Sequence, residues 1–166
     1  MHAVVVFESL WGNTEQLARE IAAGIGERTD VVDAASSPNA LDDAIDLLVV
    51  GGPTHAFSMS TGATRESAKQ QGAERIPARG IREWIQTHPA PSRAVPVATF
   101  DTRVVTPRLP GSAAKKAMKR LVALGFRPLA KPETFGVHGY AGPVAEGELE
   151  RARRWGTQLA ALLPQR

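Results

Sequence analysis

Short runs of apolar residues alternate along this chain with segments in which apolar side chains recur every three or four positions. Short valine-rich runs are typical of strands buried on both faces, and the longer periodicity is typical of amphipathic helices. The runs predict strands at 4–7, 31–34, 45–50, 95–100 and 133–137. The periodic segments predict helices at 13–26, 65–71, 81–85, 112–125 and 149–163, with a brief helix at 42–43. Trp84 and Trp155 fall on apolar helix faces, so we expect both indoles in the core.

The alternation of strands and helices predicts a parallel sheet, because parallel neighbours need a crossover connection and a helix usually provides it. We expect an α/β fold with three layers, α/β/α, in which a five-stranded parallel sheet has the strand order 2-1-3-4-5. No linker or internal repeat divides residues 1–166, so a single domain is expected. Ligands of such sheets bind beyond the carboxyl ends of the strands where the winding reverses, here between the first and third strands.

The composition limits the possible chemistry. Of the 166 residues, 43% are hydrophobic and 22% are charged, which is ordinary for a globular protein with a full core. The chain has no cysteine, which excludes disulfides, thiolate nucleophiles and cysteine-ligated metal centres. Any redox chemistry would therefore need a cofactor. The N-terminus leads directly into a strand and no apolar run could span a bilayer, so we expect a cytoplasmic protein without membrane contact.

Charge is unevenly distributed along the chain. Residues 1–100 contain 8 Lys and Arg against 12 Asp and Glu (8 − 12 = −4), and residues 101–166 contain 12 against 5 (12 − 5 = +7). The basic part has no arginine-rich arm or recognition-helix pattern. We interpret it first as a solvated helix face and second as a docking surface, and we expect no nucleic-acid partner. The four histidines show no ligand spacing, so no metal site is predicted.

A short polar loop connects the first strand to the first helix, with the sequence Ser9-Leu10-Trp11-Gly12-Asn13-Thr14. The first turn of a helix has N–H groups without internal partners and the positive end of the helix dipole, which together attract anions. Ser9, Asn13 and Thr14 add donors, and Gly12 lets the backbone approach a ligand closely. With one glycine and no lysine, the loop matches neither the P-loop nor the three-glycine dinucleotide pattern. It predicts a phosphate site, although Ser9 and Thr14 could also simply cap the helix.

Three loops at the expected ligand edge resemble, in order, the flavin-binding loops of the flavodoxin family. The resemblance covers nearly the whole chain and implies a flavodoxin-like fold that binds flavin mononucleotide (FMN). It implies contacts to the FMN phosphate from Ser9, Leu10, Trp11, Gly12, Asn13 and Thr14. It implies contacts to the flavin ring from Pro53, Thr54, His55, Ala56 and Phe57, with His55 or Phe57 packed on its inner face. It implies contacts to the pyrimidine edge from Phe100, Asp101, Thr102 and Arg103.

The sequence departs from the family pattern in two places. Trp11 stands where the family usually has a second hydroxyl, and no aromatic residue lies between Asp101 and Pro110, where the family usually has a stacking tyrosine. The outer wall of the flavin site could come from Trp11 or Tyr140 instead. Arg103 would place a cation near the ring, which predicts a higher reduction potential than that of low-potential flavodoxins.

The resemblance implies an FMN-binding redox protein, either an electron carrier or a small FMN-dependent reductase. We favour the carrier, although residues 58–80 could be the longer loop that NAD(P)H or quinone reductases of this fold have. Members of the family are usually acidic and dock basic partners, whereas this sequence has a pI of about 9.7, so we expect an acidic redox partner protein. The protein could be a monomer or a dimer.

Other interpretations of the same residues are possible. The changes at Trp11 and after the fourth strand could fill an empty site, which would make the chain a flavodoxin-like domain that has lost FMN and serves as an interaction or structural module. Ser9, His55 and Asp101 each follow a strand at one edge and could form a hydrolase triad, although Gly-x-Ser-x-Gly is absent. A phosphate-receiver domain is excluded, because residues 51–53 replace its acceptor aspartate.

Overall fold

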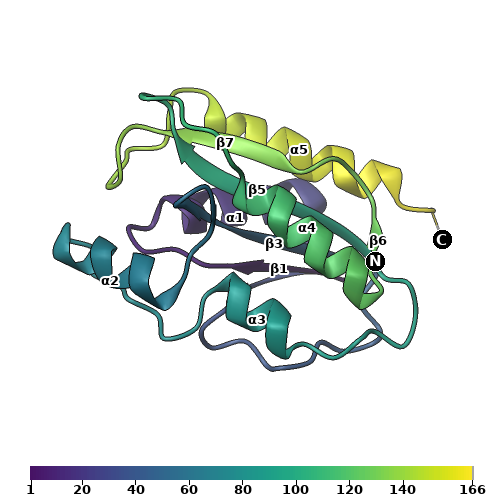
Figure 1. Ribbon diagram of the computed structural model, residues 1–166. Coiled ribbons are helices and arrows are strands. Elements are labelled where there is room, and N and C mark those ends of the chain that lie inside the picture. Colours follow the sequence, from purple (N-terminus) through teal and green to yellow (C-terminus); the bar gives the residue numbers. More distant parts are fainter. Residues whose placement is uncertain (166) are drawn as a thin grey trace.

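The computed structural model describes residues 1–165 and shows a sheet with helices on both faces (Figure 1). The strands are β1 (Ala3–Phe7), β2 (Thr29–Asp33), β3 (Leu47–His55), β4 (Ser58–Met59), β5 (Pro96–Val104), β6 (Arg127–Pro128) and β7 (Glu133–Val137). The helices are α1 (Asn13–Ile25), α2 (Gly62–Gln70), α3 (Ile81–Thr87), α4 (Ala113–Leu124) and α5 (Glu148–Leu162). Within residues 1–165, no helix combines the length and the apolarity needed to cross a membrane.

The parallel sheet has the order β2-β1-β3-β5, and β6 and β7 both pair with the far side of β5. β6 and β7 together form the fifth strand, which is interrupted between Pro128 and Glu133. This arrangement confirms the predicted α/β architecture and the strand order 2-1-3-4-5. β4 lies outside this pattern, because it forms a short antiparallel hairpin with the end of β3.

The two faces of the sheet bury two separate apolar cores, because successive side chains of a strand point to opposite faces. Val4 and Val6 of β1 pack in the core under α3 and α4, whereas Val5 and Phe7 pack in the core under α1 and α5. Figure 1 shows α3 and α4 in front of the sheet and α1 and α5 behind it. Trp84 lies in the first core and Trp155 in the second, as predicted.

Two strands are longer than the sequence predicted, and both extend toward the ligand edge. β3 continues from Val50 to His55, and β5 continues from Phe100 to Val104. Gly51 and Gly52 were expected to end β3, but they serve close packing instead. A Cβ at Gly51 would lie 2.1 Å from the Phe100 ring, and one at Gly52 would lie 2.9 Å from Ile81 Cδ1.

Two smaller predictions are wrong. The brief helix expected at residues 42–43 is a turn, because the Asp42 carboxylate accepts a hydrogen bond from the Ala44 N–H (2.9 Å) and competes with helix formation. The helical spacing of the apolar residues in the predicted helix 112–125 also placed Val122 on its buried face, but its side chain is exposed. The buried face of α4 consists of Ala113, Ala114, Ala117, Met118 and Leu121. Val122 lies to one side of that face and points to solvent.

Candidate functional site

The predicted ligand edge contains a small cavity beside the N-terminus of α1. It measures about 50 Å³, enough for a few water molecules or a group of phosphate size. It is lined by Ser9, Leu10, Trp11, Asn13, Thr14, Pro53, Thr54, His55, Thr102, Val104, Val137, Gly139 and Tyr140. None of these residues carries a permanent charge, so an anion here would be held by neutral donors.

The start of α1 supplies such donors. Gly12 adopts a left-handed backbone conformation (φ 94°) as the N-cap, and no side chain caps the helix. Within residues 1–165, the N–H groups of Asn13, Thr14 and Glu15 have no hydrogen-bond acceptor. The Gly12 N–H instead donates to Ser9 Oγ (3.1 Å), which leaves the Ser9 hydroxyl proton free to donate. The Ser9–Thr14 loop therefore has the donor set of an anion site.

Two contacts fix the other polar side chains around the small cavity. The hydroxyls of Thr14 and Thr102 lie 3.1 Å apart and are hydrogen-bonded, so α1 is tied to the end of β5. A Cβ at Gly142 would lie 2.4 Å from Asn13 Oδ1, so the β7–α5 loop packs directly against the Asn13 side chain. The Ser9–Thr14 loop, the end of β5 and the β7–α5 loop therefore meet at the small cavity.

A second, larger cavity of about 460 Å³ adjoins the small one. Its volume is within the usual range of small-molecule sites. The two cavities share Trp11, Thr54, His55, Val104, Gly139 and Tyr140. The larger cavity is further lined by Ala56, Phe57, Thr64, Ser67, Ala68, Gln71, Arg103, Thr106, Pro107, Leu109 and Pro110. Arg103 is the only permanently charged residue among the described lining residues. One elongated ligand with a small anionic end and a flat, largely apolar end would fit both cavities.

The β3–β4 turn forms one wall of the larger cavity. Ala56 and Phe57 both have positive φ (46° and 69°), which two-residue hairpin turns require but which these residue types rarely adopt. Gly111 packs against this turn, since a Cβ there would lie 2.5 Å from Phe57 Cα. The Thr54 hydroxyl accepts a hydrogen bond from the Ala113 N–H (3.2 Å). The turn is thus held in a strained conformation by the start of α4.

His55 lines both cavities and is held by α2. Its Nδ1 lies 3.2 Å from Thr64 Oγ1, a hydrogen bond between the end of β3 and the first turn of α2. Burial, with a smaller contribution from the nearby Arg65 guanidinium, lowers the pKa of His55 to about 4. The imidazole is therefore neutral at pH 7 and adds no positive charge to the site.

The structure does not bring all predicted site residues to the cavities. Phe100 is fully buried and packs against Phe135 and Trp155. Asp101 is fully buried as well, and its Oδ2 accepts hydrogen bonds from the Ser112 hydroxyl (2.5 Å) and the Ala114 N–H (3.0 Å). Asp101 thereby caps α4 rather than facing a ligand.

The reason for this difference is the length of β5. Residues 100–104 pair with β7 on one side, and residues 97–102 pair with β3 on the other, so the amides of Phe100 and Asp101 belong to the sheet. The loop that lines the cavity begins after Val104. Arg103 does line the larger cavity, and its guanidinium donates to the Leu109 carbonyl.

The proposed hydrolase triad does not form. Ser9 Oγ accepts a hydrogen bond from the Gly12 N–H, and the His55 imidazole is hydrogen-bonded to the Thr64 hydroxyl. The Asp101 carboxylate accepts from Ser112 and Ala114. Within residues 1–165, no hydrogen bond connects any two of the three. A nucleophile and its base need such a bond, so the geometry gives this alternative no support.

Sequence reasoning missed the wall formed by α2 and the buried polar network that holds it. Glu8 is fully buried; its carboxylate accepts from the Ile81 N–H (2.9 Å) and from the Ser60 hydroxyl. Arg65, only 3% exposed, donates to Ser60 Oγ (2.8 Å) and pairs with Glu83 (2.5 Å). Desolvation raises the pKa of Glu8 despite these hydrogen bonds. The network joins β1, β4, α2 and α3 just before the Ser9–Thr14 loop.

The sequence signal for the start of α2 was the Thr61–Thr64 pair, which forms a capping box. A small apolar cluster of Leu10, Ala68 and Ala73, with Trp11 and Ile76 at its edge, also attaches α2 to the Ser9–Thr14 loop. In Figure 1, α2 lies at the side of the sheet rather than over either face. It is held mainly through this cluster and the Arg65 network.

No protein-family model matches the sequence, and no curated protein matches it as a relative. Solved structures match it closely in shape. Oxidised flavodoxin 1 from Bacillus cereus superposes with a TM-score of 0.71 at 17% identity, over 99% of this chain and 100% of that one. A flavodoxin from the domain Archaea gives 0.66 at 17% identity, over 97% of each chain.

A third neighbour is a flavodoxin, WrbA-like protein from Agrobacterium tumefaciens, with a TM-score of 0.59 at 17% identity over 97% of this chain and 96% of that one. All of these likenesses extend over nearly the full length of both proteins. The chain therefore has the flavodoxin-like fold.

Proposed function

We propose that this protein binds FMN and acts in electron transfer. The observation that carries the proposal is the adjacency of the two cavities: a small, uncharged hollow at the free N–H groups of α1 shares six lining residues with a chamber of about 460 Å³. The small hollow suits a phosphate group, and the larger chamber suits a flat ring system. The flavodoxin-like fold supports this assignment by analogy.

The residues present fit the phosphate group. Ser9, Asn13 and Thr14 surround the small cavity, and the amides of Asn13, Thr14 and Glu15 have no other acceptor in the described chain. The helix dipole stabilises a negative charge at this position. Because no cation lines the hollow, its preference for a phosphomonoester comes from the geometry of the donors rather than from net charge.

The residues around the larger cavity fit the flavin ring. Phe57, Leu109 and Tyr140 offer apolar surface, while Thr64 and Ser67 of α2 and Gln71 directly after it offer hydrogen-bonding groups. Neutral His55 holds the β3–β4 turn against α2. These walls orient the ring and limit its contact with water.

Bound FMN would supply the capacity to accept and release one or two electrons, which no side chain of this cysteine-free protein supplies. Arg103 places a positive charge beside the chamber, and the strained β3–β4 turn holds the backbone of Ala56 and Phe57 at its edge. We favour a carrier over a reductase. Oxidation of NAD(P)H by the purified, FMN-loaded protein at a steady rate would instead identify a reductase.

The direct test is a titration of the flavin-free protein with FMN and with riboflavin, followed by flavin fluorescence. We expect FMN to bind at least about tenfold more tightly than riboflavin, since the phosphate adds charge-assisted hydrogen bonds. Equal affinities would exclude the phosphate assignment. Absence of binding to both would exclude FMN.

A second candidate is a domain of this fold that has lost its cofactor. One observation favours it: the rings of Trp11 and Tyr140 stack on each other beside both cavities, with centroids 6.2 Å apart. A permanent stack of these two rings would restrict the space beside the lining that the two cavities share. The titration separates the two candidates, because a domain without cofactor binds neither flavin.

A further inference from the structure

The loops around the larger cavity expose an unusual share of the apolar surface. Within residues 1–165, eight large hydrophobic side chains are exposed, and four of them lie at this cavity or beside it. They are Phe57 (52% exposed), Val105 (40%), Leu109 (55%) and Tyr140 (64%), together called the rim patch. A cluster of exposed apolar side chains at the mouth of a site marks a surface that another molecule covers.

A strongly basic segment adjoins the rim patch. Residues 102–120 contain six Lys and Arg and no Asp or Glu. Four of them are exposed on α4: Lys115, Lys116, Lys119 and Arg120. Within residues 1–165, no carboxylate forms an ion pair with any of these four side chains. Their positive charge is therefore available to a partner.

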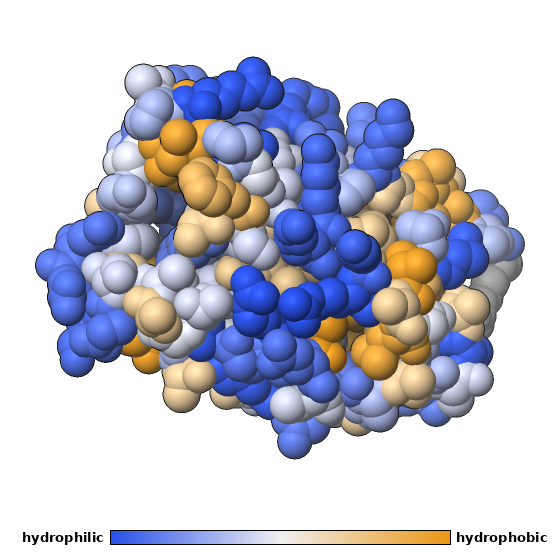
Figure 2. All heavy atoms as spheres, viewed as in Figure 1, coloured by the Kyte–Doolittle hydropathy of each residue, from blue (hydrophilic) through white to orange (hydrophobic). Residues whose placement is uncertain are grey.

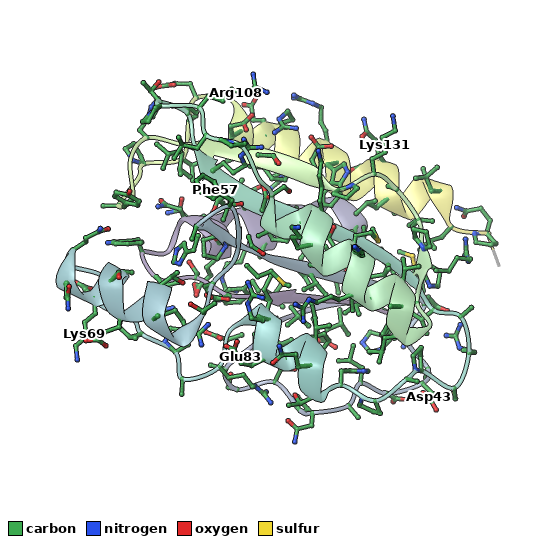
Figure 3. All side chains as sticks on the ribbon, in the orientation of Figure 1. Asp43, Phe57, Lys69, Glu83, Arg108 and Lys131 are labelled. Carbon is green, nitrogen blue, oxygen red and sulfur yellow. The ribbon has the colours of Figure 1, made fainter. Side chains whose placement is uncertain are left out.

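The apolar and basic parts form one continuous surface. Gly111 packs directly against Phe57, and Ser112 then begins α4, so Lys115 and Lys116 lie within one helical turn of the cavity wall. Figure 2 shows apolar side chains beside the β5–α4 loop and strongly hydrophilic side chains along α4 on the same face. In Figure 3, Phe57 and Arg108 lie on this side of the molecule, and Lys131 lies toward the other end.

Away from α4, exposed residues near the cavity carry charges of both signs. Glu66 and Lys69 are both exposed on α2, and Glu146, 92% exposed, precedes α5, where it pairs with His138. The net positive charge around the rim patch therefore lies on the β5–α4 loop and α4. A partner seated on the patch would bind in a defined orientation, because its negative side must face α4.

We infer that the rim patch and the basic face of α4 dock an acidic redox protein. The inference rests on the proposed function, because it places the partner over the chamber assigned to the flavin. A patch of aromatic and aliphatic side chains flanked by charges on one side is typical of a protein interface. A nucleic acid or an anionic membrane would need positive charge around the whole patch, and Glu66 and Glu146 would repel it.

The test uses an acidic [2Fe–2S] ferredoxin as probe and basic cytochrome c as its counterpart. Reduced ferredoxin is mixed with the FMN-loaded protein, and the rate of electron transfer is followed by stopped flow at low and high salt. Electrostatic steering should make this rate fall with salt, whereas the rate with cytochrome c should rise or stay constant. A ferredoxin rate that does not fall with salt would overturn the inference.

Charge reversal on α4 locates the effect. Lys115→Glu combined with Lys116→Glu should slow electron transfer from ferredoxin about tenfold at low salt. Lys131→Glu combined with Arg154→Glu changes the net charge equally, away from the patch, and should leave the rate within about twofold of the wild-type value. Equal losses in both double variants would show a net-charge effect and would overturn the inference.

A second measurement does not require bound flavin. Ferredoxin is titrated into ¹⁵N-labelled, flavin-free protein, and amide shifts are mapped by NMR. Shifts confined to Phe57, residues 105–116 and Tyr140, and lost in the α4 double variant, support the docking surface even if FMN fails to bind. Shifts elsewhere, or none, contradict it. Tighter binding of duplex DNA or phosphatidylserine vesicles than of ferredoxin, at equal salt, would also overturn it.

Discussion

The indole of Trp11 and the phenol ring of Tyr140 stack on each other with centroids 6.2 Å apart and planes inclined by 30°. The two residues come from the loops that follow β1 and β7, and both line the small and the large cavity. The pair stands at the junction of the sites assigned to phosphate and ring. Tyr140 is 64% exposed, so its ring can move without opening the core.

Tyr140→Ala should weaken FMN binding. An aromatic contact is worth about 0.5–1.5 kcal/mol beyond the area it buries, so we expect the dissociation constant to rise about 2- to 13-fold. Fluorescence titration with FMN measures it. Leu149→Ala on α5, also a partly exposed apolar side chain, is the control. Tighter binding in Tyr140→Ala would mean that the stack blocks the site, as in a domain that has lost its cofactor.

Gly12→Ala should separate phosphate binding from ring binding. Gly12 has φ 94°, and a methyl group at its Cβ position would have no neighbour within 4 Å, so alanine meets no clash and the cost is backbone strain of about 1–2 kcal/mol. When the loop of the variant relaxes to relieve this strain, its amide N–H groups turn away from the small cavity. FMN affinity should fall by about this free energy, and riboflavin affinity should not change.

The matched control for Gly12→Ala is Gly26→Ala. Gly26 follows α1, has φ 133° and also has open space around it. Gly26→Ala should reduce the free energy of unfolding by about as much as Gly12→Ala does, but it should leave the affinity for FMN unchanged. If both variants bind FMN as the wild type does, the Ser9–Thr14 loop does not hold the phosphate.

The fold could be predicted from the sequence because its strongest patterns are local. Val4, Val5 and Val6 form a strand buried on both faces, and Leu17, Ile21 and Ile25 follow at helical spacing. The errors arose where one residue type serves two purposes. Gly51 and Gly52 suggest a turn, yet they make room for Phe100 and Ile81 within the sheet.

The candidate site was only partly predictable. The Ser9–Thr14 loop was visible in the sequence, because its glycine and hydroxyls interrupt an apolar run. Residues 51–57 were expected to be a loop, whereas they continue β3 to His55 and turn only at Ala56 and Phe57. The α2 wall was not visible in the sequence, because its attachment depends on the buried Arg65, and an arginine in a polar helix is normally expected to be solvated. Its partners Ser60 and Glu83 are distant from β1 along the chain. Only the folded arrangement with Glu8 shows that these residues form one unit.

Arg65→Met should destabilise the protein strongly. The change breaks the Arg65–Glu83 ion pair and leaves Glu8 buried without a nearby cation, and breaking a buried ion pair typically costs about 3–5 kcal/mol. Lys69→Met removes a charge from the exposed side of the same helix and should change the free energy of unfolding by less than about 0.5 kcal/mol. Urea unfolding measures both. Similar stabilities for the two variants would mean that the Arg65 network does not hold α2.

His55 should make stability depend on pH in the weakly acidic range. Its pKa is about 4 in the folded protein against 6.5 for an unperturbed histidine, so the unfolded chain binds an additional proton between these values. Stability is complete above pH 6.5 and decreases as the pH falls toward 4, by at most about 3 kcal/mol. The stability difference between wild type and His55→Gln, measured by urea unfolding at pH 7 and 4.5, isolates this residue. An equal difference at both pH values would contradict burial of the imidazole.

Arg103→Gln should lower the reduction potential of the FMN-loaded protein. Arg103 lines the larger cavity and is fixed by its hydrogen bond to the Leu109 carbonyl, so its charge lies beside the chamber. A unit charge about 6 Å from the ring is worth roughly 3 kcal/mol at an effective dielectric constant near 20, and screening by water at this partly exposed site reduces it to about 1 kcal/mol. We therefore expect a decrease of tens of millivolts in a redox titration. Arg108→Gln removes an equal charge from the exposed part of the same loop and should change the potential less. Equal decreases in the two variants would assign the effect to net charge, and no decrease in either would place Arg103 too far from the ring to influence it.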